Sequence, residues 1–225
     1  MNTKNNNPKR IEKNREEGEV LENNSTTFEK IQELRDILKI MERSVTCVSL
    51  SGLGGIFAGV CALVGASFAG YWLYFDNNVP PAVLQHKLWL LAAATFVGAF
   101  LCVSLFSYLR SKKLQVPFWS SVTRRLITHI ALPFIAGSFI ILWGLNQQLY
   151  ILLLPASLII YGIAVFCGSR YSTDEARYLG MVEMFLGCVA IWLPACCGLL
   201  LWAVGFGVMH IVYGSFVWYR YERKK

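Results

Sequence analysis

Hydrophobic residues lie in four long stretches that contain no Asp, Glu, Lys or Arg, at residues 44–75, 88–109, 126–169 and 184–219. A helix that crosses a bilayer needs roughly 20 mostly apolar residues. The first two stretches have the length of one such helix each. The last two have the length of two helices each, provided that a turn divides them.

Turn-forming residues lie near the middle of both longer stretches. The third stretch contains Trp-Gly-Leu-Asn-Gln-Gln at residues 143–148, and the fourth contains Pro-Ala-Cys-Cys-Gly at residues 194–198. Proline and glycine are the strongest local signals for the end of a helix. The pattern therefore predicts an all-α membrane protein with six transmembrane helices, at residues 46–74, 88–109, 126–145, 149–168, 179–194 and 198–219. We assign residues 44–219 to one transmembrane domain.

The N-terminal region is polar. Residues 1–24 are rich in Asn, Lys and Glu, and this composition predicts disorder. Residues 25–43 are predicted to form an amphipathic juxtamembrane helix, because Thr26 and Glu29 fit a capping box and apolar residues recur at three- and four-residue spacing. The apolar face consists of Phe28, Ile31, Leu34, Leu38 and Met41. Two interpretations stay open: the helix lies on the bilayer or on the cytoplasmic loops, or it docks a cytoplasmic protein partner or a second copy of the chain.

Basic residues lie on one side of the predicted topology. The loop between spans one and two holds only Lys87, whereas the other side holds Arg110, Lys112, Lys113, Arg124, Arg125, Arg170, Arg177, Arg220, Arg223, Lys224 and Lys225. Lys and Arg near span ends favour the cytoplasmic side. We therefore expect both termini, including the basic tail at residues 220–225, in the cytoplasm. The net charge of +7 then reflects topology and contact with anionic lipid, and it predicts no nucleic-acid partner.

A glycine recurs at a similar place in each predicted span, after aliphatic or aromatic residues. Spans one, three and five contain Gly59, Gly137 and Gly187, and spans two, four and six contain Gly98, Gly162 and Gly214. Glycine lets the backbones of neighbouring membrane helices approach closely, so we expect these residues, with Gly55, to be helix-packing glycines. Their order predicts three tandem helical hairpins. The hairpins are parallel repeats, unlike the inverted repeats of many secondary transporters.

The last hairpin carries a family resemblance. It has Gly187 within its first helix, Pro194 at its turn, a leucine-rich return from Leu199 and Gly214 near its end. This pattern resembles the HdeD-like acid-resistance membrane proteins of bacteria, most closely over residues 179–219. The longer first outer loop and the extended N-terminal region depart from that family. The resemblance implies a small protein of the bacterial cytoplasmic (inner) membrane that is tied to envelope or acid stress, and it supplies no catalytic residues.

Three ionisable residues lie within the predicted spans: His129, Glu183 and His210. Such residues are candidates for function because charge is costly inside a membrane. Glu183 and His210 are nearly equidistant from the turn at residues 194–198, so an antiparallel hairpin would place them at the same depth. They would form either a structural hydrogen bond or a group that responds to pH. At the start of the fifth helix, Ser172 and Thr173 are expected to cap the backbone, with Asp174 and Glu175 in the first turn.

The sequence contains no recognisable catalytic or phosphate-binding motif, and the seven cysteines lack metal-ligand spacing. We therefore predict no enzymatic activity, no cofactor and no metal. The function expected is that of a non-enzymatic multi-pass inner-membrane protein in envelope or acid-stress maintenance, or in signalling to a cytoplasmic partner through residues 25–43. The alternative is a channel or carrier for a small solute or a proton. Flux in proteoliposomes would separate the two.

Overall fold

The computed structural model describes residues 29–37, 51–76, 80–115 and 117–223, and these residues form two units that we treat separately. In the N-terminal unit, residues 29–37 are helical and Ile31 and Leu34 are exposed. The other members of the predicted docking face, Phe28, Leu38 and Met41, lie outside the described residues, as do residues 1–24.

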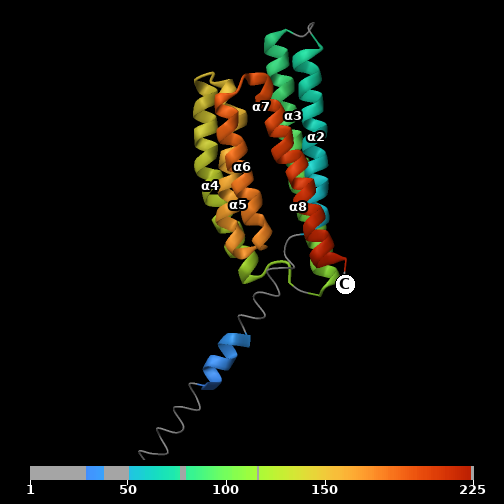
Figure 1. Cartoon of the computed structure of the whole chain (residues 1–225), viewed down its shortest axis with the longest axis vertical. Helices are drawn as coiled ribbons and strands as arrows, with labels where there is room; N and C mark the ends of the chain where they lie inside the picture. The colour runs from blue at the N-terminus through green and yellow to red at the C-terminus, as the bar shows by residue number, and fades with distance from the viewer. Residues whose placement is uncertain (1–28, 38–50, 77–79, 116, 224–225) are drawn as a thin grey trace, which may run out of the picture. The chain divides into compact units, whose positions relative to one another are not determined.

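The larger unit is all-helical, and the described residues contain no strand. Its helices are α2 (Gly52–Tyr74), α3 (Pro81–Lys113), α4 (Ser121–Asn146), α5 (Tyr150–Gly168), the short η1 (Ser169–Tyr171) and α6 (Asp174–Trp192) (Figure 1). The chain then continues through α7 (Ala195–Trp202), η2 (Ala203–Met209), α8 (His210–Val217) and η3 (Trp218–Glu222). These four segments follow one another without a break, and we call them together the C-terminal helix. Its η2 and η3 segments are π-helical.

Five of the described helices are long and apolar enough to cross a membrane, by length and composition. They are α2, α3, α4, α5 with η1, and the C-terminal helix from Cys196 onward. The helix α6 is not among them. It carries Asp174, Glu175 and Arg177 near its start and Glu183 near its middle. The sixth crossing therefore stays a prediction.

The helix ends follow local chemistry rather than the limits of the uncharged stretches. Pro81 lies in the first turn of α3, where its missing N–H costs nothing, and α4 is capped by Ser120 Oγ, which accepts the N–H of Thr123 at 3.1 Å. The turn between α4 and α5 places Gln148 in the left-handed region, with φ 58°.

The prediction that the side chains of Ser172 and Thr173 cap α6 is wrong. Thr173 occupies the capping position, but its hydroxyl pairs with Tyr213 at 3.1 Å instead.

The helices of the larger unit pack in two groups of three. In one group, which we call the α5 group, α4 and α6 pack on α5. In the other, the α2 group, α3 and the C-terminal helix pack on α2. Figure 1 shows α4, α5 and α6 on one side, and α2, α3 and α8 on the other. The helix α6 and the C-terminal helix, which the sequence pairs as the third hairpin, thus make their main contacts with different neighbours, and the two groups meet between them.

Glycines allow the closest helix contacts within both groups. A Cβ at Gly162 would lie 2.7 Å from Gly180 O, and a Cβ at Gly187 would lie 2.9 Å from Pro155 O. In the α2 group a Cβ at Gly214 would lie 2.5 Å from Gly52 O. Such distances leave no room for a side chain, because the obstacle is backbone. The predicted packing glycines Gly55, Gly59 and Gly137 also lie against neighbouring helices, whereas a Cβ at Gly98 would meet only Cys61 Sγ, at 4.0 Å.

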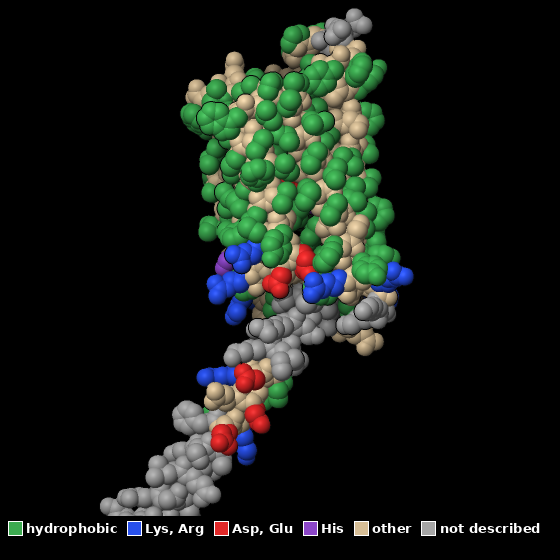
Figure 2. Space-filling view, viewed as in Figure 1, with side chains coloured by type: hydrophobic (Ala, Val, Ile, Leu, Met, Phe, Trp, Pro, Cys, Tyr) green, Lys and Arg blue, Asp and Glu red, His purple; other side chains and the backbone are tan. Residues whose placement is uncertain are grey.

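The surface of the larger unit is divided by residue type. Figure 2 shows hydrophobic side chains over most of the visible face, with Lys and Arg gathered at one end. That end contains the end of α3, the start of α4, the connection from α5 to α6 and the end of the C-terminal helix. The basic residues of these segments are Arg110, Lys112, Lys113, Arg124, Arg125, Arg170, Arg177, Arg220 and Arg223. We call this the basic end.

Candidate functional site

Glu183 and His210 meet where the two helix groups adjoin. Glu183 lies on α6 and has no exposed surface, and His210 is the first residue of α8. The Oε1 atom of Glu183 lies 3.4 Å from His210 Nδ1. The other ring nitrogen, Nε2, lies 2.6 Å from the hydroxyl of Tyr161 on α5. The structure thus brings together two of the three ionisable residues that the sequence singled out, and adds a tyrosine.

The local conformation of each helix explains why the three side chains meet. Gly180 and Gly187 flank Glu183 on α6 and bring that helix against α5, which carries Tyr161. On the other side, η2 is π-helical, and π-helical turns are frequent at functional sites. His210 Nδ1 lies 3.1 Å from the carbonyl oxygen of Gly205. A Cβ at Gly205 would lie 2.5 Å from Glu183 Oε2, so this glycine leaves room for the carboxyl group.

These contacts determine the tautomer of His210. The carbonyl of Gly205 can only accept a hydrogen bond, so Nδ1 must carry the hydrogen that it receives. In the neutral ring, Nε2 then accepts the hydrogen bond from the Tyr161 hydroxyl. The Nδ1–H group is therefore used by the backbone, although Glu183 Oε1 lies within ion-pair distance of the same atom.

Glu183 is left without a hydrogen-bond donor. Both of its carboxyl oxygens are buried and make no hydrogen bond in the described structure. A buried carboxylate without a donor is costly, because neither water nor protein replaces the lost hydration. The charge of Glu183 is balanced when the Glu183–His210 pair holds one proton, either as carboxylate and imidazolium or as carboxylic acid and imidazole. The pair, together with Tyr161, is the buried polar cluster of the fold.

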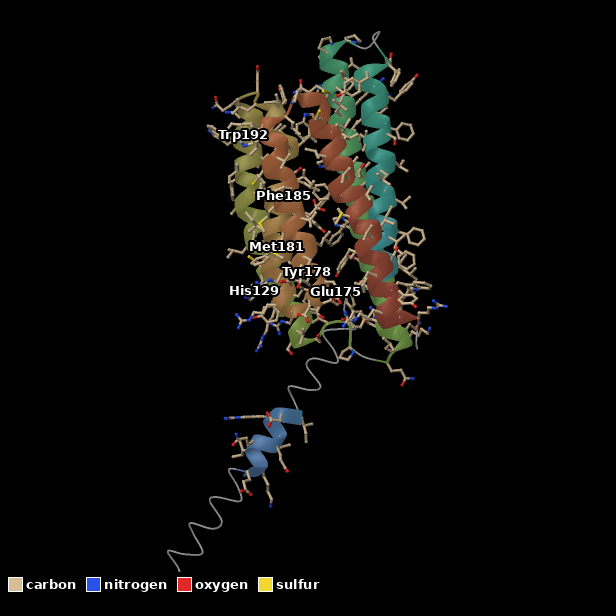
Figure 3. The ribbon with its side chains drawn as sticks, in the orientation of Figure 1. His129, Glu175, Tyr178, Met181, Phe185 and Trp192 are labelled. Atoms are coloured by element: carbon tan, nitrogen blue, oxygen red, sulfur yellow. The ribbon has the colours of Figure 1, made fainter. Side chains whose placement is uncertain are left out.

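Further polar contacts connect the two groups along the same boundary. They join α5, α6 and Thr173 to the C-terminal helix, and we call this boundary the polar seam. Away from the basic end, Trp202 Nε1 donates to Ser157 Oγ at 3.2 Å. Toward the basic end, Tyr213 pairs with Thr173, and Arg220 Nη1 lies 2.9 Å from Glu175 Oε1. Figure 3 labels Glu175 near the basic end.

The end of the C-terminal helix also binds the α2 group. Glu222 Oε1 accepts the backbone N–H of Gly52 at 2.5 Å and lies 3.0 Å from Arg110 Nη1. Both partners of this ion pair are largely buried. The C-terminal helix therefore carries His210 near its middle and, three turns later, a residue that holds the first turn of α2.

His129 does not join the cluster. It is exposed on α4, its Nδ1 lies 2.8 Å from the carbonyl of Arg125, and its ring lies 4.6 Å from that of Tyr171. Figure 3 places its label on the α4 side, near the basic end. Its contacts are with α4 itself and with η1.

Several residues of the seam were missed by sequence reasoning. They are Ser157, Tyr161, Gly205, Trp202 and Tyr213, and each lies among apolar residues without an ionisable neighbour in sequence. A usable signal was the helical face of His210. Trp202, Phe206, His210 and Tyr213 recur at three- and four-residue spacing, so one face of the C-terminal helix is aromatic and polar.

Two other features lie apart from the cluster. An apolar hollow of about 200 Å³ lies between α4, α5 and α6, lined by residues such as Trp143, Leu152 and Ile191, and none of its lining residues is ionisable. The described residues contain no group of three His, Cys, Asp or Glu side chains placed to hold a metal ion. Comparison with protein-family models, with curated proteins and with solved structures finds no match for this chain.

Proposed function

We propose that the chain is a six-span, non-enzymatic membrane protein whose Glu183–His210–Tyr161 cluster responds to protons. The five apolar helices support the membrane location. The exposed face of α6 supports the sixth span. Its residues Tyr178, Met181, Phe185 and Trp192 (Figure 3) are all exposed and apolar or aromatic. Glu183 of the same helix is buried. The charged residues near the start of α6 lie at the basic end, where headgroups would receive them.

The basic end supports an orientation with both termini in the cytoplasm of a bacterium. Fusions of alkaline phosphatase, which is active only outside the cytoplasm, test this orientation and the sixth span together. A fusion after Pro194 should be active and a fusion after Tyr171 inactive. Equal activity of both fusions would remove α6 from the membrane-spanning helices.

One observation carries the functional proposal: the buried Glu183 carboxyl group has no hydrogen-bond donor, and it lies 3.4 Å from a histidine on the other helix group. With one proton on the pair, the cluster is neutral. A second proton gives a net positive charge inside the seam, at a position without exposed surface, and charge burial of this kind is costly. Acid therefore weakens the packing of the α5 group against the C-terminal helix.

The other titratable groups near the cluster do not offset that charge. Tyr161 on α5 is neutral in this pH range and already bonds His210. Tyr213 on the C-terminal helix lies within electrostatic range of Tyr161 and bonds Thr173. Glu175 is held by Arg220 and Tyr221.

The C-terminal helix offers a path from the cluster to the cytoplasmic side. A displacement of His210 is carried along the helix to Glu222, which holds the first turn of α2. In the sequence, eight residues separate the predicted docking region at residues 25–43 from the start of α2 at Gly52. This arrangement suits a protein that reports to a cytoplasmic partner. The tie to acid or envelope stress comes from the HdeD-like resemblance.

Hydrogen–deuterium exchange of the purified full-length chain in lipid nanodiscs tests the proposal. Between about pH 8 and pH 5, where histidine titrates, exchange corrected for its intrinsic pH dependence should become faster in α6 and in the C-terminal helix. The double variant Glu183→Gln/His210→Gln should lose this response, and His129→Gln, the matched control outside the seam, should keep it. An equal response in all three proteins would overturn the proposal.

The polar seam favours a second candidate, a carrier for a proton or small solute. Polar side chains follow the boundary of the two helix groups from Ser157 and Trp202 to the basic end, and transport pathways in membrane proteins run between helix groups. Proteoliposomes loaded with a pH-sensitive dye separate the candidates. Proton flux that is present with the parent protein and disappears in Glu183→Gln favours the carrier. Absence of proton flux with the parent protein favours the sensor.

A further inference from the structure

We propose that Glu183 is the binding site for a protonated amine that carries an aromatic or other apolar group. The proposal rests on the proposed function in one respect: it takes the same buried cluster as the functional centre. It adds the chemical class of a ligand, which a proton-responsive cluster does not require.

The first reason is the pair of unused acceptors. Both carboxyl oxygens of Glu183 are buried and accept no hydrogen bond, although the neighbouring His210 donates to Gly205 O and bonds Tyr161. An ammonium group supplies the N–H donors that the carboxylate lacks, and its positive charge can take the place of the proton that Glu183 and His210 share. A quaternary ammonium group supplies the charge without the donors.

The second reason is a continuous run of aromatic rings beside the cluster. The rings of Trp202 and Phe206 lie 4.9 Å apart, those of Phe206 and Tyr161 lie 4.9 Å apart, and Tyr161 adjoins His210 at 5.2 Å. Aromatic faces attract cations and accept aromatic groups of a ligand. Trp202 and Phe206 lie on the C-terminal helix and Tyr161 on α5. A ligand with its ammonium group at Glu183 would thus have aromatic side chains of both helix groups for its apolar part.

The third reason is the position of the site at the boundary of the two helix groups. Glu183 belongs to the α5 group and its contacts His210 and Gly205 belong to the C-terminal helix. Separation of the two helices exposes the carboxyl group, Tyr161 and Phe206 to the same space. Binding sites within membrane bundles lie between helices in this way.

Charge balance specifies how many protons leave the site when the amine binds. Because a net charge is costly to bury, the proposal takes the resting pair of Glu183 and His210 to share one proton and to be neutral. When the ammonium ion binds the Glu183 carboxylate, His210 is neutral, the pair holds no proton and the site is again neutral with the ligand included. Each amine bound therefore releases one proton from the pair to the buffer.

Isothermal titration calorimetry of the full-length chain in nanodiscs, near neutral pH, tests the proposal with 2-phenylethylamine as the probe. Saturable binding is expected, and titrations in buffers of different ionisation enthalpy should give about one proton released per amine. The N,N,N-trimethyl analogue should bind roughly 10- to 100-fold more weakly, because it forms no charge-assisted hydrogen bond with the carboxylate.

Three variants separate ligand binding from folding. Glu183→Gln should lose the binding, and Glu183→Asp should keep part of it. His210→Gln should keep the binding and still release about one proton, because charge balance then places that proton on the Glu183 carboxyl group at rest. Each variant is compared with the parent protein by size-exclusion chromatography, so that a misfolded variant is excluded. Absence of saturable binding to the parent protein, or equal affinity in Glu183→Gln, would overturn the proposal. An acid response in hydrogen exchange that persists without amine binding would leave the proposed function standing and remove only the ligand.

Discussion

The carboxylate of Glu222 binds the backbone N–H of Gly52, so the last turn of the C-terminal helix holds the first turn of α2. The first N–H groups of a helix have no partner within it, and a carboxylate at that end also balances the helix dipole. Arg110, at the end of α3, lies against the same oxygen. One side chain thus joins three helix ends of the α2 group.

Substitution of Glu222 tests this joint. Glu222→Ala removes the acceptor of the Gly52 N–H group and the ion pair with Arg110, and we expect a loss of about 1–3 kcal/mol in unfolding free energy. Glu175→Ala is a suitable control because its partner Arg220 is 58% exposed, and such pairs contribute less than about 1 kcal/mol. Unfolding in detergent, followed by circular dichroism, measures both. A larger loss for Glu175→Ala would contradict the assignment.

Two glycines that the sequence treats as equivalent should respond differently to alanine. A Cβ at Gly214 would lie 2.6 Å from the backbone nitrogen of Ile56, which cannot move without shifting α2, so Gly214→Ala should destabilise the protein by about 1–3 kcal/mol. At Gly98 the nearest atom is Cys61 Sγ, at 4.0 Å, and Gly98→Ala should be neutral or slightly stabilising. Melting temperatures of the two variants decide this, and equal losses would show that α3 packs more closely than the structure has it.

Gly205 and Glu183 should be energetically coupled. Gly205→Ala places a methyl group 2.5 Å from Glu183 Oε2, and it should weaken both the stability and the acid response. In a Glu183→Ala background the methyl group meets only Leu158 Cδ2, at 2.7 Å, which is the end of a flexible side chain, so the same substitution should cost less. A double-mutant cycle by thermal unfolding should give a coupling energy of roughly 0.5–3 kcal/mol. Additive effects would show that the carboxyl group does not occupy the space beside Gly205.

The Tyr161 hydroxyl should hold the tautomer of His210. Tyr161→Phe removes the hydrogen bond to Nε2, and a loss of about 1 kcal/mol is expected. The ¹⁵N chemical shifts of His210 should also move toward a mixture of tautomers. Tyr150→Phe is the matched control, because Tyr150 bonds Gln85 at an exposed position. Unchanged His210 shifts in Tyr161→Phe would contradict the contact.

Sequence alone located most of the helices, because uncharged stretches mark them well. The helices extend past those stretches, as α3 does to Pro81 and Lys113, since helix formation does not depend on the absence of charge. Sequence also selected Glu183 and His210 by their cost inside a membrane. It did not identify Tyr161 or Gly205, because their roles depend on which face of α5 and of η2 turns toward α6, and helix rotation is set by packing. The predicted hairpin repeat and the six-span topology stay predictions, and so does the docking face at residues 25–43.

The helices of the α5 group are consecutive in the sequence, whereas those of the α2 group are not. This difference has a consequence for biogenesis. The α5 group consists of α4, α5 and α6, which follow one another in the sequence, so its helices can pack together soon after they are synthesised. In the α2 group, α3, α4, α5 and α6 are all synthesised between α2 and its partner, the C-terminal helix. The glycines of α2 that face the C-terminal helix, including Gly52, Gly55 and Gly59, therefore lack this neighbour until synthesis is nearly complete. If synthesis stops before Ala195, the α5 group is complete but α2 lacks the C-terminal helix. Membrane quality control would then meet a chain whose α2 glycines are not covered.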